Sequence, residues 1–222
     1  MGAMTDGTIL IDKPAGVTSF GVVARIRRVL SRDVGKKVKV GHTGTLDPFA
    51  TGLMILVVGK ECRNAGNYSK LDKVYEATFR LGQVSTTGDP EGELTGVSDR
   101  QLTRQEVERV VARYVGKIMQ RPPIFSAIKI NGQRAYKLAR DGKEVEIPER
   151  QVEVFSLEIM QYTYPELTIR THVSSGTYIR SLCVDIGEAL ATGAYCTQLR
   201  RTRIADWSVN DAQHLSEFGI EN

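Results

Sequence analysis

The stretch GHTGTLDPFATG, residues 41–52, places a single carboxylate, Asp47, directly before Pro48 in a polar, glycine-rich loop. Carboxylate pairs such as those of aspartic proteases and glycosidases need a second acid nearby, and residues 34–60 hold no other Asp or Glu. A lone Asp can act as a nucleophile when a cation keeps it ionised and directed. Arginine suits this task, because its fork holds a carboxylate in one geometry. The Asp-Pro pair taken alone favours a turn whose Asp caps the local backbone.

Other chemistries of glycine-rich loops do not fit this stretch. A phosphate-binding P-loop needs Lys and Ser or Thr after its glycines, and a dinucleotide fingerprint opens a helix, whereas the apolar run LMILVV follows here. The three cysteines are far apart and have no histidine at metal-ligand spacing, so neither a disulfide framework nor a zinc site is indicated. No metal site is expected.

Hydrophobic periodicity and turn signals divide the chain into short elements. Residues 74–81 alternate, which puts Tyr75 and Ala77 on the opposite face from Val74 and Glu76. Thr103 and Glu106 predict a capping box that opens a helix to Tyr114. The other expected strands are 8–12, 53–58, 151–164, 167–174, 195–199 and 204–209, and the other expected helices are 20–30 with Ser19 as N-cap, 62–71 and 176–190.

Strands outnumber helices in this pattern and do not alternate with them regularly, so a parallel βαβ sheet is disfavoured. The fold class expected is α+β, a mixed, mostly antiparallel central sheet flanked by helices. Residues 120–142 interrupt the alternation with Pro122-Pro123, a basic strand-like segment and a short helix ending near Gly142, and this segment indicates an insertion. Residues 5–222 are expected to form one domain.

Charge distribution favours a polyanionic partner. The 222 residues carry 30 Lys and Arg against 26 Asp and Glu, a net charge of +4. Residues 117–150 alone hold eight bases and four acids, also +4, and Arg200, Arg201 and Arg203 form a second cluster. Two basic segments suit a nucleic-acid backbone. The longest apolar run, 53–58, is too short for a membrane span and no signal peptide is apparent, so no membrane partner and a cytoplasmic location are expected.

Ordered motifs along nearly the whole chain resemble the TruB family of tRNA pseudouridine synthases. GHTGTLDPFATGLM is similar to the motif II of that family. The motifs that follow in family order are LIDKPAGVTS (10–19), YEATFRLG (75–82), QRPPIFSAIKINGQRAYKLARDG (120–142), SSGTYIRSL (174–182) and LRRT (199–202). Blocks of this length in one order indicate common descent.

The resemblance implies roles for single residues. Asp47 matches the essential catalytic aspartate, Arg180 matches its guanidinium partner, and Tyr75 matches the tyrosine that stacks on the target base. A guanidinium beside a carboxylate would depress the pKa of the acid and fix its direction. Judged without the resemblance, Arg180 would be a surface side chain on a helix and Tyr75 a core residue.

Four further positions match residues that contact RNA or line the uracil pocket. His42 corresponds to the residue that fills the space vacated by the flipped base, and stacking there would offset part of the cost of unstacking. Tyr178 and Leu199 correspond to pocket residues, and Lys13 belongs with Pro14 to the turn of the first motif. Residues 120–150 correspond to a thumb that closes over the RNA, where Lys and Arg would contact phosphates.

The resemblance implies an isomerase that converts a T-loop uridine of tRNA, tRNA position 55, to pseudouridine. An enzyme of this family uses no cofactor and no metal. The expected partner is the T arm of tRNA, and a monomer is expected. Bacterial relatives usually carry a further C-terminal RNA-binding domain, which is expected to be absent. The alternative is a non-catalytic RNA-binding or RNA-folding protein, because the basic segments fit both.

Overall fold

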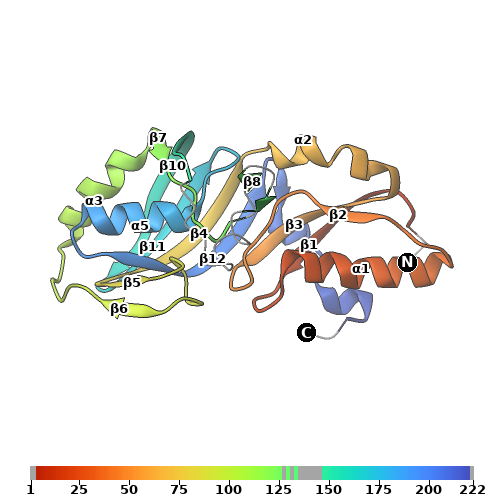
Figure 1. Ribbon diagram of the computed structural model, residues 1–222, viewed down its shortest axis with the longest axis horizontal. Helices are drawn as coiled ribbons and strands as arrows, with labels where there is room; N and C mark the ends of the chain where they lie inside the picture. Colours follow the sequence, from red (N-terminus) through yellow and green to blue (C-terminus); the bar gives the residue numbers. More distant parts are fainter. Residues whose placement is uncertain (1–3, 127–128, 131–132, 135–146, 221–222) are drawn as a thin grey trace. The chain divides into compact units, whose positions relative to one another are not determined.

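The computed structural model describes residues 4–126, 129–130, 133–134 and 147–220 (Figure 1). The chain divides into two compact units. The first unit combines the residues up to Tyr75 with those from Arg200 onward, and the second unit spans Glu76–Leu199. Strands β4 (Lys73–Leu81) and β12 (Ala194–Ile204) contribute residues to both units.

The first unit is built on strand β3 (Thr51–Val58), whose residues after Thr51 are almost all fully buried. β1 (Gly7–Lys13) pairs antiparallel with β3 from Gly7 opposite Val58 to Lys13 opposite Gly52, and the short β2 (Val40–His42) also pairs antiparallel with β3. Near the C-terminal end of the chain lie β13 (Trp207–Ser208) and the 3-10 turns η3 (Val209–Asp211) and η4 (Leu215–Phe218). Since β1 and β2 both pair with β3, the uninterrupted apolar run that forms β3 is the central strand of this unit.

Helix α1 (Ser19–Val34) lies alongside this sheet (Figure 1). Its N-cap is Thr18, whose hydroxyl accepts from the Gly21 amide at 2.9 Å, so the prediction of Ser19 as N-cap is wrong by one residue. Both hydroxyls could cap, and Thr18 is the one with extended backbone angles. The helix runs past the expected end at Leu30 to Val34, where Gly35 takes the left-handed conformation.

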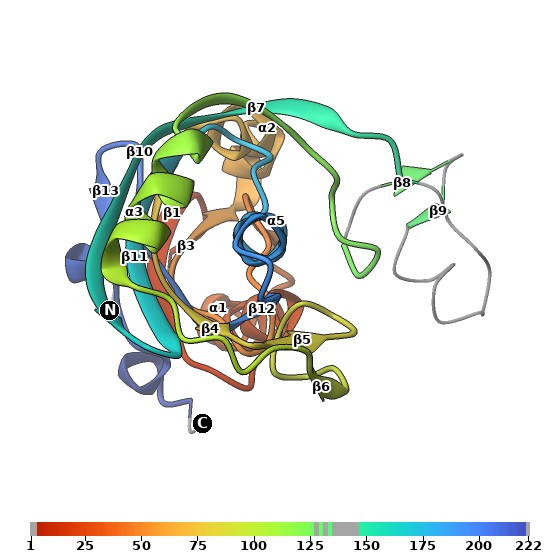
Figure 2. The same ribbon diagram turned by 90° about the vertical axis from the view of Figure 1, so that its left-hand side faces the viewer.

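The second unit carries strands β12, β4, β11 (Glu166–Val173), β10 (Arg150–Thr163) and β7 (Gly116–Gln120) in that order. β10 pairs antiparallel with both β11 and β7, and the three strands curve around helix α5 (Ile179–Ala189), as Figure 2 shows. The helical segment α3 (Arg104–Val111) continues as η2 (Ala112–Tyr114), and β5 (Gln83–Ser85) pairs with β6 (Leu94–Gly96). This curvature encloses the inner face of α5.

Several local predictions are confirmed. Thr103 and Glu106 form the capping box with both hydrogen bonds, and Tyr75 and Ala77 are buried on β4 while Val74 and Glu76 are half-buried. The expected helix at 62–71 is η1 (Gly59–Arg63) followed by the single-turn α2 (Ala65–Ser69).

The end of the chain departs from expectation. The strand expected at 195–199 is β12, which continues through the arginines to Ile204. Of the strand expected at 204–209, only Trp207 and Ser208 form a separate strand, β13, which pairs antiparallel with the end of β12. Residues 127–128, 131–132 and 135–146 of the expected thumb, and with them its helix near Gly142, lie outside the described residues. The described part of the thumb includes the short antiparallel pair β8 (Lys129–Ile130) and β9 (Gln133–Arg134).

The fold class is α+β with a mixed, mostly antiparallel sheet, as expected. β1 and β2 pair antiparallel with β3, and β7 and β11 pair antiparallel with β10. One parallel contact is brief and places Arg200 and Arg201 of β12 beside Thr51 and Gly52 of β3. The strand ends at this parallel contact lie next to the loop that carries Asp47, so the sheet determines where that loop begins and ends.

Candidate functional site

Asp47 lies in the first unit, in the loop that joins β2 to β3, and its side chain is half-buried. The Asp47 carbonyl accepts from the Ala50 amide at 3.2 Å, which closes a tight turn through Pro48. On the preceding side, the Ser19 hydroxyl bonds both the amide and the carbonyl of Leu46, each at 2.8 Å. The backbone on each side of the carboxylate is therefore fixed by specific hydrogen bonds.

Two buried cations hold this loop from the inside. Lys13 is completely buried, and its ammonium donates to the carbonyls of Pro14, Val17 and Pro48 at 2.8, 2.7 and 3.2 Å. Arg201 is 1% exposed, and its guanidinium donates to the carbonyls of Leu53 at 2.8 Å and Gly44 at 3.1 Å. Carbonyl dipoles around a buried charge offset part of its desolvation cost. Because the two side chains bond backbone carbonyls of the loop, both ends of the loop depend on them.

Glycine is required at one position of this loop for a steric reason. Gly52 has a φ of +105°, and a Cβ there would lie 2.3 Å from the carbonyl oxygen of Arg201. Around Gly41 and Gly44 a Cβ would meet no atom closer than 3.4 Å. Gly52 thus permits a close approach to the neighbouring strand β12.

Lys13→Met removes a buried donor shared by three carbonyls, of which that of Pro48 keeps its hydrogen bond from the Gly16 amide at 2.8 Å. We expect the free energy of unfolding to fall by about 2–4 kcal/mol, because a charge-assisted hydrogen bond contributes more than a neutral one and unsatisfied buried acceptors are costly. Urea unfolding of the variant measures this loss. Lys39→Met, at an exposed position, is the matched control, and equal losses in the two variants would contradict the assigned role of Lys13.

The other first-unit candidates also have defined positions. His42 ends β2 opposite Leu56 and is half-buried, five residues before Asp47. Tyr75 lies in β4 and is 7% exposed. Burial of Tyr75 is compatible both with a core position and with a ring that forms one wall of a site.

In the second unit, Arg180 lies in the first turn of α5 and is 4% exposed, so it is not the surface side chain that its helical position would suggest. Its guanidinium donates to the Asp89 carboxylate at 3.0 Å and to the carbonyls of Thr87 at 2.9 Å and Phe125 at 2.8 Å. A buried arginine needs such partners, because an uncompensated buried charge is strongly destabilising.

Asp89 is the acidic residue that the sequence reasoning missed. Its carboxylate is 5% exposed and uses Oδ2 for Arg180, while Oδ1 accepts from the Thr87 hydroxyl at 2.5 Å and from the Glu91 amide at 3.1 Å. The available signal was TGDP, residues 87–90, a second Asp-Pro pair in a turn-rich segment. Arg180 is thus held by an acid from a distant loop of its own unit.

Tyr178 immediately precedes α5 and Leu199 lies on β12 in this unit. The backbone amide of Tyr178 donates to the side-chain oxygen of Gln120 at 2.8 Å, and its carbonyl accepts from the side-chain nitrogen of Gln120 at 3.0 Å. The Arg150 guanidinium lies 5.2 Å from the Tyr178 ring centroid, a cation–π distance. Leu199 is 7% exposed near the middle of β12.

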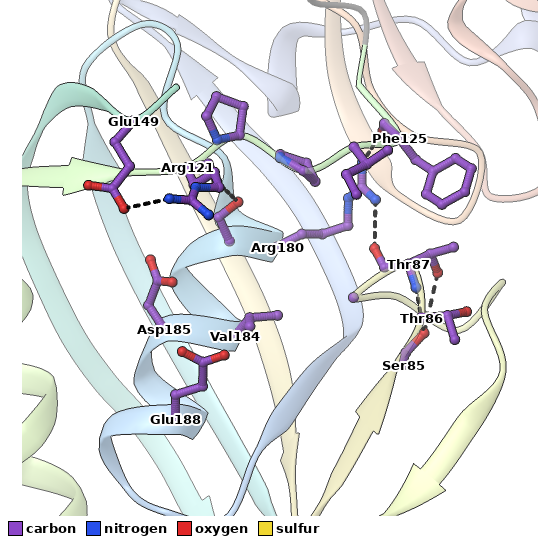
Figure 3. Close-up of a pocket in the computed structure, with 15 residues that line it drawn as sticks. Ser85, Thr86, Thr87, Arg121, Phe125, Glu149, Arg180, Val184, Asp185 and Glu188 are labelled. Carbon is purple, nitrogen blue, oxygen red and sulfur yellow. Dashed lines mark hydrogen bonds and ion pairs between the residues drawn. The ribbon is translucent and has the colours of Figure 1, made fainter. Parts of the chain in front are cut away.

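A hollow of about 440 Å³ opens beside Arg180 in the second unit (Figure 3). It is lined by residues 85–88, by 121–125 and by one face of α5. Figure 3 shows Arg121 paired with Glu149 on one wall, at 3.4 Å, with Asp185 and Glu188 along α5. The volume is within the range of small-molecule sites. No sequence pattern pointed to this hollow.

Asp185 is expected to make stability depend on pH. Burial, reinforced by Glu188 and then by Glu149, raises the pKa of Asp185 from 3.8 to about 6. Between these values the folded protein binds more protons than the unfolded chain, so this group's contribution to stability is lost as pH rises from about 4 to above 6.

Asp185→Asn should therefore stabilise the protein at pH 7.5 by about 1–2 kcal/mol, with a much smaller gain at pH 4.5, where the carboxyl is largely protonated. Urea unfolding at the two pH values measures the difference. Asp99→Asn, at an exposed position, should show no such pH-dependent gain. A gain of equal size at both pH values would rule out titration of Asp185 as its cause.

Among residues 4–126, 129–130, 133–134 and 147–220, no group of three or more His, Cys, Asp or Glu side chains could hold a metal ion. The helices in the same ranges include none with the length and apolar character to cross a membrane.

Comparison with solved structures first defines the class of the fold. The chain superposes on a structure described as a Cbf5-Nop10-Gar1 complex with a TM-score of 0.73 at 28% identity, covering 100% of this chain and 58% of that one. An archaeal box H/ACA sRNP Nop10-Cbf5 complex gives 0.70 at 26%, covering 96% and 52%. The chain thus spans just over half the length of these proteins and shares their fold.

The family follows from the sequence models. The TruB family pseudouridylate synthase N-terminal domain matches residues 27–179, and the tRNA pseudouridylate synthase B C-terminal domain matches residues 180–219. The chain belongs to the TruB family of pseudouridylate synthases.

Curated relatives agree with this assignment. A tRNA pseudouridine synthase B from Phocaeicola vulgatus is 43% identical over 216 residues, covering 96% of this chain and 92% of the relative. One from Chloroherpeton thalassium is 44% identical over 214 residues, covering 95% and 88%. One from Corynebacterium jeikeium is 42% identical over 222 residues, covering 96% and 70%.

Proposed function

We propose that this protein isomerises a uridine in the T loop of tRNA to pseudouridine, with Asp47 as the essential catalytic residue. Its membership of the TruB family, at more than 40% identity to relatives named tRNA pseudouridine synthase B, is the observation that carries the proposal. The fixed loop around Asp47 supports it, because a catalytic group must be held in one geometry.

In the proposed reaction the glycosidic bond between C1′ of the ribose and N1 of uracil breaks, the base turns, and a new bond joins C1′ to C5. The C5 proton is lost and N1 is protonated, so the product is an isomer of the substrate. Asp47 acts as a carboxylate at the base or at the sugar. Such chemistry needs one ionised oxygen at the nucleoside and no second acid.

Arg180 is the proposed partner of Asp47, and its observed contacts support that role. Asp89 and the carbonyls of Thr87 and Phe125 hold the guanidinium in one orientation. A fixed guanidinium would keep a nearby carboxylate ionised and would direct it. Tyr75 is proposed to stack on the uracil, while Tyr178 and Leu199 line its pocket.

Flipping a uridine out of a folded loop costs a few kcal/mol of stacking and pairing, which contacts with the protein must replace. We propose His42 for the vacated space in the RNA and the basic residues of the thumb for the phosphates. Lys13 acts indirectly, through its hydrogen bond to Pro48. The T arm would be recognised mainly by its shape.

Release of tritium from RNA labelled at uracil C5 tests the proposal, since that hydrogen is lost only when C5 forms the new bond. We expect release from a T-arm hairpin whose only labelled uridine is the T-loop target. A hairpin with the label at a stem uridine should release none. Release from the stem uridine alone would show that the substrate assignment is wrong.

A further inference from the structure

Helix α1 carries a concentrated positive charge that the proposed chemistry does not use. Residues 25–39 contain seven Lys and Arg and one Asp, a net charge of +6. The whole chain carries +4, so the remaining residues sum to −2. The net charge of this segment thus exceeds even the +4 of residues 117–150.

The structure gathers three of these bases, Arg27, Arg28 and Arg32, on one face of α1. Positions 24, 27, 28, 31, 32 and 35 recur at the helical spacing of three and four, so their side chains share one stripe. The buried residues Val22, Val23, Ile26 and Leu30 form the opposite stripe, which faces the core. Arg28, Arg32, Lys36 and Lys37 are exposed, and Arg27 is half-buried.

A fixed turn adds two lysines to this face. Gly35 takes a φ of +71° and its amide bonds the Arg32 carbonyl, which ends the helix. The Val38 amide then donates to the Ser31 hydroxyl at 3.0 Å, so residues 36 and 37 are folded back beside the last turn. The result is a shallow hollow of about 550 Å³ lined by residues 24, 27, 28, 31, 32 and 35–37.

The charges in this hollow are nearly all uncompensated. Arg32 pairs with Asp33 at 3.0 Å, an exposed contact that contributes little. In the described part of the chain no carboxylate lies within 4.0 Å of the charged groups of Arg27, Arg28, Lys36 or Lys37. The partial negative charge of a helix C-terminus is only about half a unit and is far outweighed by these cations.

We propose that this hollow, formed by the C-terminal half of α1 and the turn after it, binds phosphates of the RNA backbone away from the target uridine. This inference rests on the proposed function for the identity of the polyanion. The length of α1 gives the separation between the hollow and the loop that carries Asp47. The side chain of Ser19, at its start, bonds Leu46 beside Asp47, and Arg27 lies eight residues further on. At 1.5 Å per residue, the basic face begins about 12 Å along the helix and extends to about 24 Å.

The test is binding of intact tRNA as a function of salt, measured without turnover. For the variant with both Arg28→Glu and Lys36→Glu we expect the dissociation constant to rise about 10- to 30-fold at 0.15 M salt. We expect the slope of log affinity against log salt to fall by about 1.4–1.8, as two lost phosphate contacts require. The variant Arg28→Lys with Lys36→Arg keeps the charges and should bind like the parent.

The matched control reverses Arg109 and Arg113, which are exposed on α3 and η2. An equal loss in that control, or an unchanged salt slope in the α1 variant, would overturn the proposal. Loss of binding to anionic lipid vesicles with tRNA binding intact would overturn it too. If tRNA binding changes as expected while the uracil C5 assay is negative, the proposed function fails and the RNA site stands.

Discussion

Asp47→Asn is expected to reduce pseudouridine formation by at least about 10⁴-fold, because a neutral amide cannot supply the ionised oxygen that the reaction requires. The substitution conserves shape, and Ser19, Lys13 and Arg201 form hydrogen bonds with backbone groups of the loop, so the fold should persist. Tritium release from C5-labelled T-arm RNA measures the activity, and retained tRNA affinity shows that the site is still formed.

Asp99→Asn removes an exposed carboxylate of the second unit and should leave both activity and binding unchanged. The same experiment separates the enzyme from its alternative, an RNA-binding or RNA-folding protein. If the parent protein bound tRNA but produced no pseudouridine, the alternative would be favoured. Activity above about 1% in the Asp47→Asn variant would show that Asp47 is not essential.

Arg180→Met should be the most destabilising of these substitutions. It leaves the Asp89 carboxylate buried without its cation and removes the donor to the carbonyls of Thr87 and Phe125. Breaking a buried ion pair from one side costs about 3–5 kcal/mol. Urea unfolding measures the loss, and activity should fall to the background level.

A second substitution distinguishes the structural role of Arg180 from its proposed catalytic role. Adding Asp89→Asn to Arg180→Met removes the uncompensated charge and should restore part of the stability, a coupling that a double-mutant cycle measures. Activity should not return, because the proposed partner of Asp47 is still missing. Recovery of activity together with stability would show that Arg180 acts only through folding.

Much of the fold could be predicted because the local sequence pattern of an element agrees with its burial in the folded protein. The alternation of β4, the capping box at Thr103 and the apolar run of β3 each reflect one element and its burial. Membership of the family could also be predicted, since the family motifs are local sequences. The resemblance drawn from them is confirmed by the match over residues 27–179.

The errors arose where a residue serves a distant part of the chain. The cluster Arg200, Arg201 and Arg203 looked like a basic segment for a nucleic-acid backbone, yet Arg201 is buried within β12 against loop carbonyls. Ser19 looked like an N-cap, but its hydroxyl bonds Leu46, 27 residues away. Periodicity cannot identify such partners.

The candidate site shows the same limit. The sequence indicated Asp47 and Arg180 through the family motifs, but it gave no reason to join Arg180 to Asp89, which lies 91 residues away. Asp89 stands in a short turn with no periodic signal, and its function as a buried counter-charge is visible only from the contacts. That Asp47 and Arg180 act on one uridine stays a prediction, as do the roles of Tyr75, His42, Tyr178 and Leu199.

The sharpest experiment is a structure of the Asp47→Asn variant bound to T-arm RNA. We expect a T-loop uridine turned out of the RNA, with the side chain at position 47 within about 3.5 Å of the nucleoside and the Arg180 guanidinium beside it. A target uridine still stacked in the loop, or a residue 47 that contacts neither the uracil nor its ribose, would show that Asp47 is not the catalytic group.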